Sequence, residues 1–248
     1  MERWQNRVAV VTGASSGIGS AVTKDLIAAG LVVVGLARRK ERVDEIRASL
    51  PAKQQNRLHA IKCDVSDMQS VNEAFDWIEK HLGTVEILIN NAGTYTSGQL
   101  LTLEIDTLQQ TLQTNVMGIV YCTRRAFQSM QKANVNHGHV ILINSVVGHY
   151  IFNPPPGSVP TFNIYPPTKY AVTGLTEILR QEFRELKTKI KITSVSPGLV
   201  DTEIVPDIYK KMQMLKAEDI SAGVMYCLST PPHVQVHELT IKPVGEMF

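Results

Sequence analysis

Two side chains that could exchange a proton stand four residues apart in the stretch IYPPTKYAV, residues 164–172. Tyr165 and Lys169 would project from one face of a helix, because residues four apart are neighbours on a helical surface. The two prolines between them are tolerated only in a first helical turn, where backbone N–H groups have no intrahelical partner. The spacing therefore predicts a helix that begins close to Tyr165, capped by Thr161 or Asn163.

A phenol beside an ammonium is suited to general acid–base catalysis. Free tyrosine has a pKa of about 10. A positive charge about 4 Å away, at an effective dielectric of about 20, favours the phenolate by about 4 kcal/mol, or about three pKa units, although desolvation opposes this effect. We expect Lys169 to contribute to lowering the pKa of Tyr165. Taken alone, the pair is also an ordinary start of an amphipathic helix.

The segment VAVVTGASSGIG, residues 8–19, indicates a strand, a glycine-rich turn and a helix start. Glycines at 13, 17 and 19 would let the backbone approach a pyrophosphate, and the helix start favours an anion. The alternative is a tight turn that binds nothing. The position after the first strand favours a dinucleotide.

The second strand ends in GLARRKER, where Arg38 and Arg39 stand in place of the acidic residue that an NAD site would carry. Arginine suits a 2′-phosphate through its charge and planar fork. The alternative is a solvated basic helix start, since Lys40 and Arg42 follow. We expect NADP(H), with Arg38 as the stronger candidate. Asp64 and Val65, beyond the third strand, would meet the adenine.

Strands and helices alternate along the chain, which predicts an α/β fold: a doubly wound, seven-stranded parallel sheet with helices on both faces in one domain, 1–248. The expected strands are 8–12, 31–36, 58–63, 85–90, 139–144, 190–196 and 236–242. The expected helices are 17–29, 40–49, 67–82, 103–132, 165–187 and 217–229. Two irregular segments, about 148–164 and 197–216, follow strand ends and are candidate walls of a site.

These stretches together resemble the short-chain dehydrogenase/reductase (SDR) family, classical type. TGASSGIG matches its TGxxxGxG, NNAG (90–93) its fourth-strand motif, YPPTK its YxxxK, and SVSPGLVDT its sixth-strand PG motif. The resemblance covers the chain from Asn6 to about Pro243 and implies a Rossmann fold. Within the family, the chain is similar to the animal subgroup called member eleven, which includes insect NADP-dependent farnesol dehydrogenases.

The resemblance implies that Tyr165 is the general acid/base, aided by an oxidised nicotinamide, and that Lys169 also binds the nicotinamide ribose. Ser145 would bind the substrate oxygen and Asn115 a relay water. The alternatives are that Ser145 caps a turn and that Asn115 faces solvent. The cofactor residues would be Gly13, Ser15, Ser16, Gly17, Ile18, Gly19, Arg38, Arg39, Asp64, Val65, Asn91, Ala92, Gly93, Tyr165, Lys169, Pro197, Gly198, Val200 and Thr202.

The chain departs from the family's YSASK-like motif at Pro166 and Pro167, which would shift the tyrosine slightly. The prolines of 148–164 leave the pocket shape open. An apolar pocket with one polar end suits a hydrophobic alcohol or carbonyl. We expect farnesol-like alcohols first, then steroids and small aromatic carbonyls. The pocket candidates, half of which could be core or interface residues, are Tyr95, Val147, Tyr150, Ile151, Phe152, Phe162, Val205, Ile208, Met212 and Met214.

Composition narrows the classes of protein. The net charge of +2 and the absence of a basic block argue against nucleic acid. Three cysteines without CxxC spacing argue against metal or disulfides, so we expect a cytoplasmic protein with reduced thiols. No apolar run is long enough for a membrane span, and the N-terminus has no signal-peptide core. The resemblance implies a homodimer or homotetramer.

Two rivals remain. A catalytically silent NADP-binding regulator would have lost the tyrosine, lysine or serine, and all three are present. A dehydratase or epimerase on the same scaffold would use other chemistry. Neither rival would change nicotinamide absorbance with an alcohol or carbonyl.

Overall fold

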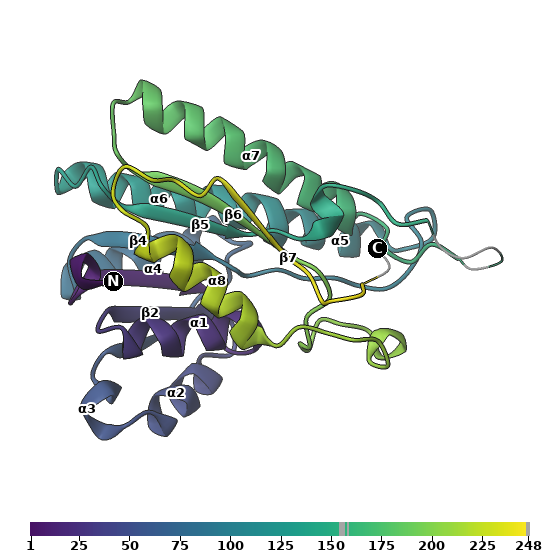
Figure 1. The fold of residues 1–248 in the computed structure, drawn as a ribbon, viewed down its shortest axis with the longest axis horizontal. Coiled ribbons are helices and arrows are strands. Elements are labelled where there is room, and N and C mark those ends of the chain that lie inside the picture. Colours follow the sequence, from purple (N-terminus) through teal and green to yellow (C-terminus); the bar gives the residue numbers. More distant parts are fainter. Residues whose placement is uncertain (154–156, 158, 247–248) are drawn as a thin grey trace.

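The seven strands form one parallel sheet in the order β3-β2-β1-β4-β5-β6-β7 (Figure 1), which confirms the predicted doubly wound architecture. The computed structural model describes residues 1–153, 157 and 159–246, and only the backbone of Ile208. The strands are β1 Val8–Thr12, β2 Val32–Ala37, β3 Leu58–Lys62, β4 Val85–Asn90, β5 His139–Ile143, β6 Lys191–Pro197 and β7 Glu238–Ile241.

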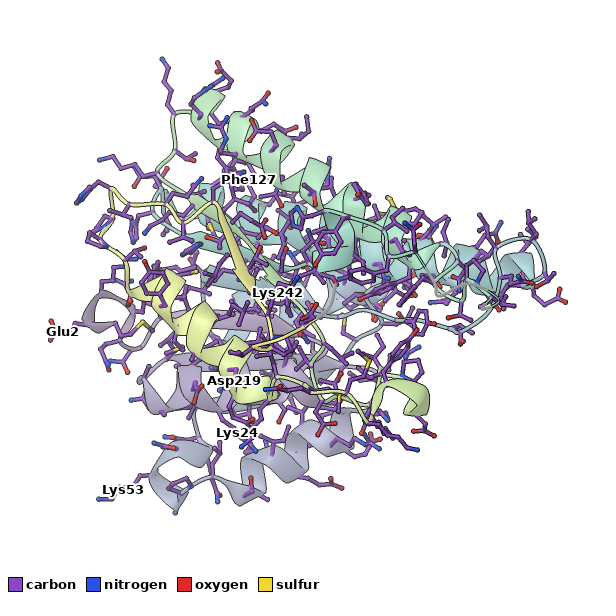
Figure 2. All side chains as sticks on the ribbon, turned by 45° about the vertical axis from the view of Figure 1, so that its right-hand side comes forward. Glu2, Lys24, Lys53, Phe127, Asp219 and Lys242 are labelled. Carbon is purple, nitrogen blue, oxygen red and sulfur yellow. The ribbon has the colours of Figure 1, made fainter. Side chains whose placement is uncertain are left out.

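Helices cover both faces of the sheet. One face carries α1 Gly17–Ala28, α2 Lys40–Ser49 and α8 Ala217–Ser229, and the other carries α4 Met68–His81, α6 Gly118–Lys132 and α7 Tyr165–Glu185. In Figure 2, Lys24 of α1 and Asp219 of α8 lie on one side, and Phe127 of α6 lies on the other. Shorter elements are α3 Ala52–Gln55, α5 Ile105–Leu112, a π-helical segment Gln113–Met117, and 3₁₀ turns Glu2–Trp4, Val146–Gly148 and Asp207–Tyr209.

Each face has its own hydrophobic core. Val22 and Leu26 of α1 pack with Val224 of α8, whereas Phe75 of α4 packs with Ala126 of α6 on the opposite face. The central strands are buried along their whole length because helices cover both of their faces. This double burial explains why these strands are continuous apolar runs in the sequence.

The helix predicted over 103–132 is wrong in its middle and at its start. The structure begins α5 at Ile105, widens into π-helical turns at Gln113–Met117, and continues as α6. Asn115 lies within the wide turns with its side chain buried. Single π turns inside α-helices occur often at functional sites, and nothing in the apolar periodicity marks this one.

α7 begins at Tyr165, as predicted, with both prolines in its first turn. The capping prediction is wrong. Ile164 occupies the cap position without a side-chain cap. Asn163 adopts a left-handed φ of 42°, and its side-chain amide donates to the carbonyl oxygens of Thr96, at 2.7 Å, and Gly98, at 3.1 Å. Asn163 thus ties the start of α7 to the loop after β4 instead of capping the helix.

Within the described residues, no helix is both long and apolar enough to cross a membrane.

Candidate active site

The carboxyl ends of the strands enclose a cavity of about 1180 Å³. Its walls come from the turns after β1, β2, β3, β4, β5 and β6, together with parts of the two irregular segments that the sequence singled out. The strand order runs outward in opposite directions from β1 and from β4, which makes the boundary between these two strands a topological switch point. Ligands of open α/β sheets bind at such a point. The volume is large enough for a nucleotide cofactor and a second small molecule.

The turn after β1 leaves room for a ligand only because it is built from glycine. Gly13 has a φ of 65°, and a Cβ atom there would lie 2.9 Å from Cα of Ala92. Gly17 has a φ of 51°, and its Cβ would lie 2.9 Å from Cγ2 of Thr202. Larger residues at these two positions would collide with Ala92 and Thr202 and strain the backbone at the start of α1. These residues therefore fit the pyrophosphate of a dinucleotide at the N-terminal end of that helix.

The loop after β4 braces this turn. The amide nitrogen of Asn91 donates to Thr12 Oγ1 at 2.9 Å, and its side chain donates to the carbonyl oxygens of Thr12, at 2.9 Å, and Gly13, at 3.2 Å. The side-chain amide of Asn91 thus holds the backbone of the turn after β1 in place. Asn91, Ala92 and Gly93 also line the cavity.

The end of β2 brings arginines to the rim. Arg38 and Arg39 are exposed and line the cavity. Arg39 Nη2 lies 3.0 Å from Glu203 Oε2, and Arg42 Nη1 lies 2.6 Å from Glu203 Oε1. These two arginines hold the pKa of Glu203 below its ordinary value. The carboxylate comes from the segment after β6, so the sequence around β2 gave no signal for it.

The other end of the cavity holds the proton-exchanging groups. Ser145 follows β5, caps the turn Val146–Gly148 by accepting from the Val147 amide at 3.3 Å, and lines the cavity together with Tyr165. Desolvation raises the pKa of Tyr165 to about 12, the Ser145 hydroxyl opposes that rise, and the nearby Tyr95 adds to it. The ring of Tyr95 packs edge-on against Tyr165, with centroids 5.4 Å apart.

Lys169 is buried, and its Nζ donates to the carbonyl oxygen of Ile143 at 2.9 Å. Its Nζ lies 5.7 Å from the centre of the Tyr165 ring. Burial lowers the pKa of Lys169 to about 8. Lys169 alone therefore does not lower the pKa of Tyr165 as we expected. Desolvation of the phenol outweighs the effect of a charge at that distance.

Asn115 lies behind the cavity wall rather than in it. Its Oδ1 accepts from the Thr94 amide at 2.8 Å, and its Nδ2 donates to the Thr94 carbonyl at 2.9 Å and to Thr168 Oγ1 at 3.2 Å. Thr168 in turn donates to the carbonyl oxygen of Tyr165 at 2.6 Å. The amide of Asn115 thus connects the loop after β4 to the first turn of α7.

Aromatic and aliphatic side chains line the remaining wall. The ring of Phe162 stacks on that of Tyr209, with ring centroids 6.1 Å apart. The centroids of the Phe162 and Tyr95 rings are 6.0 Å apart. The structure brings these predicted pocket residues to the cavity: Tyr95, Val147, Ile151, Phe152, Phe162 and Val205. Tyr150, Met212 and Met214 do not line it. The side chain of Ile208 lies outside the described part of the chain.

Every predicted cofactor residue except Gly19 lines the cavity. Gly19 lies underneath, where a Cβ atom would collide with the carbonyl oxygen of Gly13. Sequence reasoning missed Leu100, Leu101, Tyr209 and Glu246, which also line the cavity. Glu246 lies beside Gly198, and burial raises the pKa of its carboxyl group. No motif marks these positions, because loops and the C-terminal segment bring them in.

The part of the chain that the structure describes contains no group of three or more His, Cys, Asp or Glu side chains able to hold a metal ion.

Comparison with known proteins gives concordant matches. A family model described as short chain dehydrogenase matches residues 7–213. A farnesol dehydrogenase from Aedes aegypti is 54% identical over 251 residues, covering 100% of both chains. A dehydrogenase/reductase SDR family member 11 from Gallus gallus is 41% identical over 259 residues, again covering 100% of both. A solved structure, the closed form of a serine dehydrogenase complexed with NADP⁺, has a TM-score of 0.85 at 27% identity and covers 97% of this chain and 96% of that one.

Proposed function

Since the chain belongs to the short chain dehydrogenase family, we propose that it is an NADP(H)-dependent oxidoreductase that interconverts a hydrophobic alcohol and its aldehyde or ketone. The best candidate substrate is a farnesol-like isoprenoid alcohol. The observation that carries this proposal is the placement of Ser145, Tyr165 and Lys169 together in the wall of an otherwise largely apolar cavity.

In this proposal a bound nicotinamide would supply the hydride acceptor for alcohol oxidation and the hydride donor for carbonyl reduction. Ser145 donates a hydrogen bond to the substrate oxygen and orients it toward the phenol. Tyr165 takes the hydroxyl proton during alcohol oxidation and returns a proton to the carbonyl oxygen during reduction. In the protein alone, the raised pKa keeps Tyr165 protonated at neutral pH, so the acid form required for reduction is the resting form.

Lys169 has two tasks. Its ammonium is anchored to the Ile143 carbonyl and lies one helical turn from Tyr165, so its charge favours the phenolate that alcohol oxidation requires. By family resemblance it also binds the nicotinamide ribose. Asn115 acts as a positioning residue, because it fixes Thr168 and the first turn of α7.

NADP(H) is favoured over NAD(H) by the two exposed arginines after β2 and by the uncharged Ala37 that precedes them. The serine dehydrogenase of similar structure was solved with NADP⁺. Pro197, Gly198, Val200 and Thr202 would complete the nicotinamide end of the site, since all four line the cavity.

An apolar substrate is favoured by the side chains around the reacting groups, among them Val147, Phe152 and Phe162. Such a wall gains free energy by removing hydrocarbon from water, and the cation beside Tyr165, Lys169, is buried and already donates to the Ile143 carbonyl. The 54% identical relative is a farnesol dehydrogenase, which makes an isoprenoid alcohol the first substrate to test.

Homo-oligomerisation belongs to the same proposal. Ile105 and Leu112 on α5 and Ile178 on α7 are exposed to 64%, 41% and 52%, and a second copy of the chain would bury them. Cysteines 63, 122 and 227 are buried free thiols, which supports a cytoplasmic location.

The test is nicotinamide absorbance with a panel of isoprenoid, steroid and small aromatic alcohols and carbonyls. Reduction of NADP⁺ by farnesol supports the whole proposal. Activity on other carbonyls alone retains the mechanism and removes the isoprenoid substrate. Tight NADP⁺ binding without turnover on any compound would favour a regulator.

A further inference from the structure

One carboxylate holds two arginines at the rim of the cavity. Glu203 follows Thr202 in the segment after β6, and both its oxygens are engaged: Oε2 with Arg39 at 3.0 Å and Oε1 with Arg42 at 2.6 Å. Arg39 immediately precedes α2, and Arg42 lies in the first turn of that helix. Glu203 and Arg39 both line the cavity.

Arg38 differs from Arg39. Among the described residues it has no ion-pair or hydrogen-bond partner, and it lies exposed at the same rim. A 2′-phosphate would meet Arg38 directly, but it would have to take Arg39 from Glu203. A phosphate monoester carries nearly two negative charges and three acceptor oxygens, so it is a stronger partner for a guanidinium than one carboxylate.

We propose that Glu203 is a specificity-determining residue whose carboxylate competes with the 2′-phosphate of NADP(H) for Arg39. The inference rests on the proposed use of NADP(H). The attraction of the arginines for the phosphate is then partly cancelled by Glu203. An adenosine ribose without the 2′-phosphate does not compete for Arg39, so Glu203 leaves its affinity unchanged.

The expected effect is modest, because the three side chains are about half exposed and exposed ion pairs are weak. Glu203→Gln should tighten binding of 2′,5′-ADP about three- to ten-fold and change binding of 5′-AMP less than about two-fold. The gain should shrink in about 0.5 M salt, where screening acts within a few ångströms. A purely structural tie would instead weaken both nucleotides when it is broken.

The experiment is calorimetric titration of wild type, Glu203→Gln and Glu41→Gln with 2′,5′-ADP and with 5′-AMP. Glu41 lies exposed in the first turn of α2, so its variant loses the same charge near the arginines without breaking the described contacts. A thermal melt checks that each variant is folded. The proposal predicts a selective gain for 2′,5′-ADP in Glu203→Gln and a smaller gain in Glu41→Gln.

The outcomes separate this inference from the proposed function. If the wild type prefers 2′,5′-ADP and Glu203→Gln shows no further gain, the competition is refuted and NADP(H) use stands. If the wild type has no preference and Glu203→Gln acquires one, the competition is supported and the NADP(H) assignment fails. An equal gain in both variants, or equal changes for both nucleotides, also refutes the competition.

Discussion

The Nζ atom of Lys169 lies 5.7 Å from the centre of the Tyr165 ring, one turn further along α7. The ammonium donates to the Ile143 carbonyl and not to the phenol, so it influences the phenol through its charge alone. Desolvation dominates at this distance, and the pKa of Tyr165 is raised to about 12 in the protein alone. The charge of an oxidised nicotinamide would add to that of Lys169 during alcohol oxidation.

Replacing Tyr165 with Phe removes the hydroxyl group while keeping the ring that packs on Tyr95. We expect kcat to fall roughly 10²- to 10⁴-fold, the usual contribution of a positioned acid–base group, with NADP⁺ affinity nearly unchanged. Steady-state kinetics and cofactor titration measure the two effects. Tyr170→Phe is the matched control, because Tyr170 is an exposed tyrosine on the same helix. Retained turnover in Tyr165→Phe would end the acid–base assignment.

Replacing Arg38 with Asp and Arg39 with Ala should shift cofactor preference from NADP(H) toward NAD(H). The aspartate can accept from a ribose 2′-hydroxyl, and the charge that suits a phosphate is gone. The ratio of kcat/KM for the two cofactors reports the change. Arg47→Ala on α2, which removes a nearby arginine that pairs with Asp44, is the control. An unaltered ratio would move the 2′-phosphate site elsewhere.

Pro167 is exposed in the first turn of α7 and adds rigidity to the unfolded chain rather than contacts to the core. Pro167→Ala should lower the free energy of unfolding by about 0.4–1 kcal/mol. Turnover should stay within about two-fold, because a first-turn residue needs no intrahelical N–H bond. Urea unfolding and kinetics test both statements. A ten-fold loss of turnover would mean that the proline sets the position of the phenol.

The buried His139 should make the free energy of unfolding fall as the pH is lowered. It is fully buried, and desolvation, with the charges of Lys191 and Arg3, lowers its pKa to about 3. Between pH 6.5 and 3 the unfolded chain binds a proton at His139 that the folded chain does not bind, so stability falls as the pH falls through this window. The contribution is about 1.4 kcal/mol for each pH unit.

Urea unfolding at pH 6.5 and pH 5.0 measures this effect in wild type and in His139→Gln. The amide can keep a hydrogen bond to Thr193 Oγ1, which lies 2.8 Å from the imidazole, and it does not titrate. The loss of stability between the two pH values should be smaller in the variant by roughly 2 kcal/mol. Equal losses in the two proteins would show that His139 does not titrate as described.

The fold, the family and the strand-end residues could be predicted from the sequence, because doubly buried strands are continuous apolar runs and parallel strands end at one edge of the sheet. The match of the short chain dehydrogenase model to residues 7–213 confirms the family. Other features depend on tertiary structure. The contact between Glu203 and Arg39 joins residues 164 apart in the chain, and spacing gave no indication of it.

The rise in the pKa of Tyr165 could not be predicted from the sequence, for the same reason. Helical spacing gives the distance between two side chains on one face, but desolvation depends on what packs around them, here Tyr95 and the cavity wall. The π-helical turn at Asn115 could not be predicted either, since the partners of the Asn115 side chain, Thr94 and Thr168, lie in other parts of the chain.

The most direct test of the central claim follows NADP⁺ reduction by farnesol with purified wild type and Tyr165→Phe side by side. We expect farnesol to increase NADPH absorbance with the wild type and not with Tyr165→Phe, while both proteins bind NADP⁺. A wild type that binds NADP⁺, and yet changes the absorbance with no alcohol or carbonyl of the panel, would contradict the proposed oxidoreductase activity.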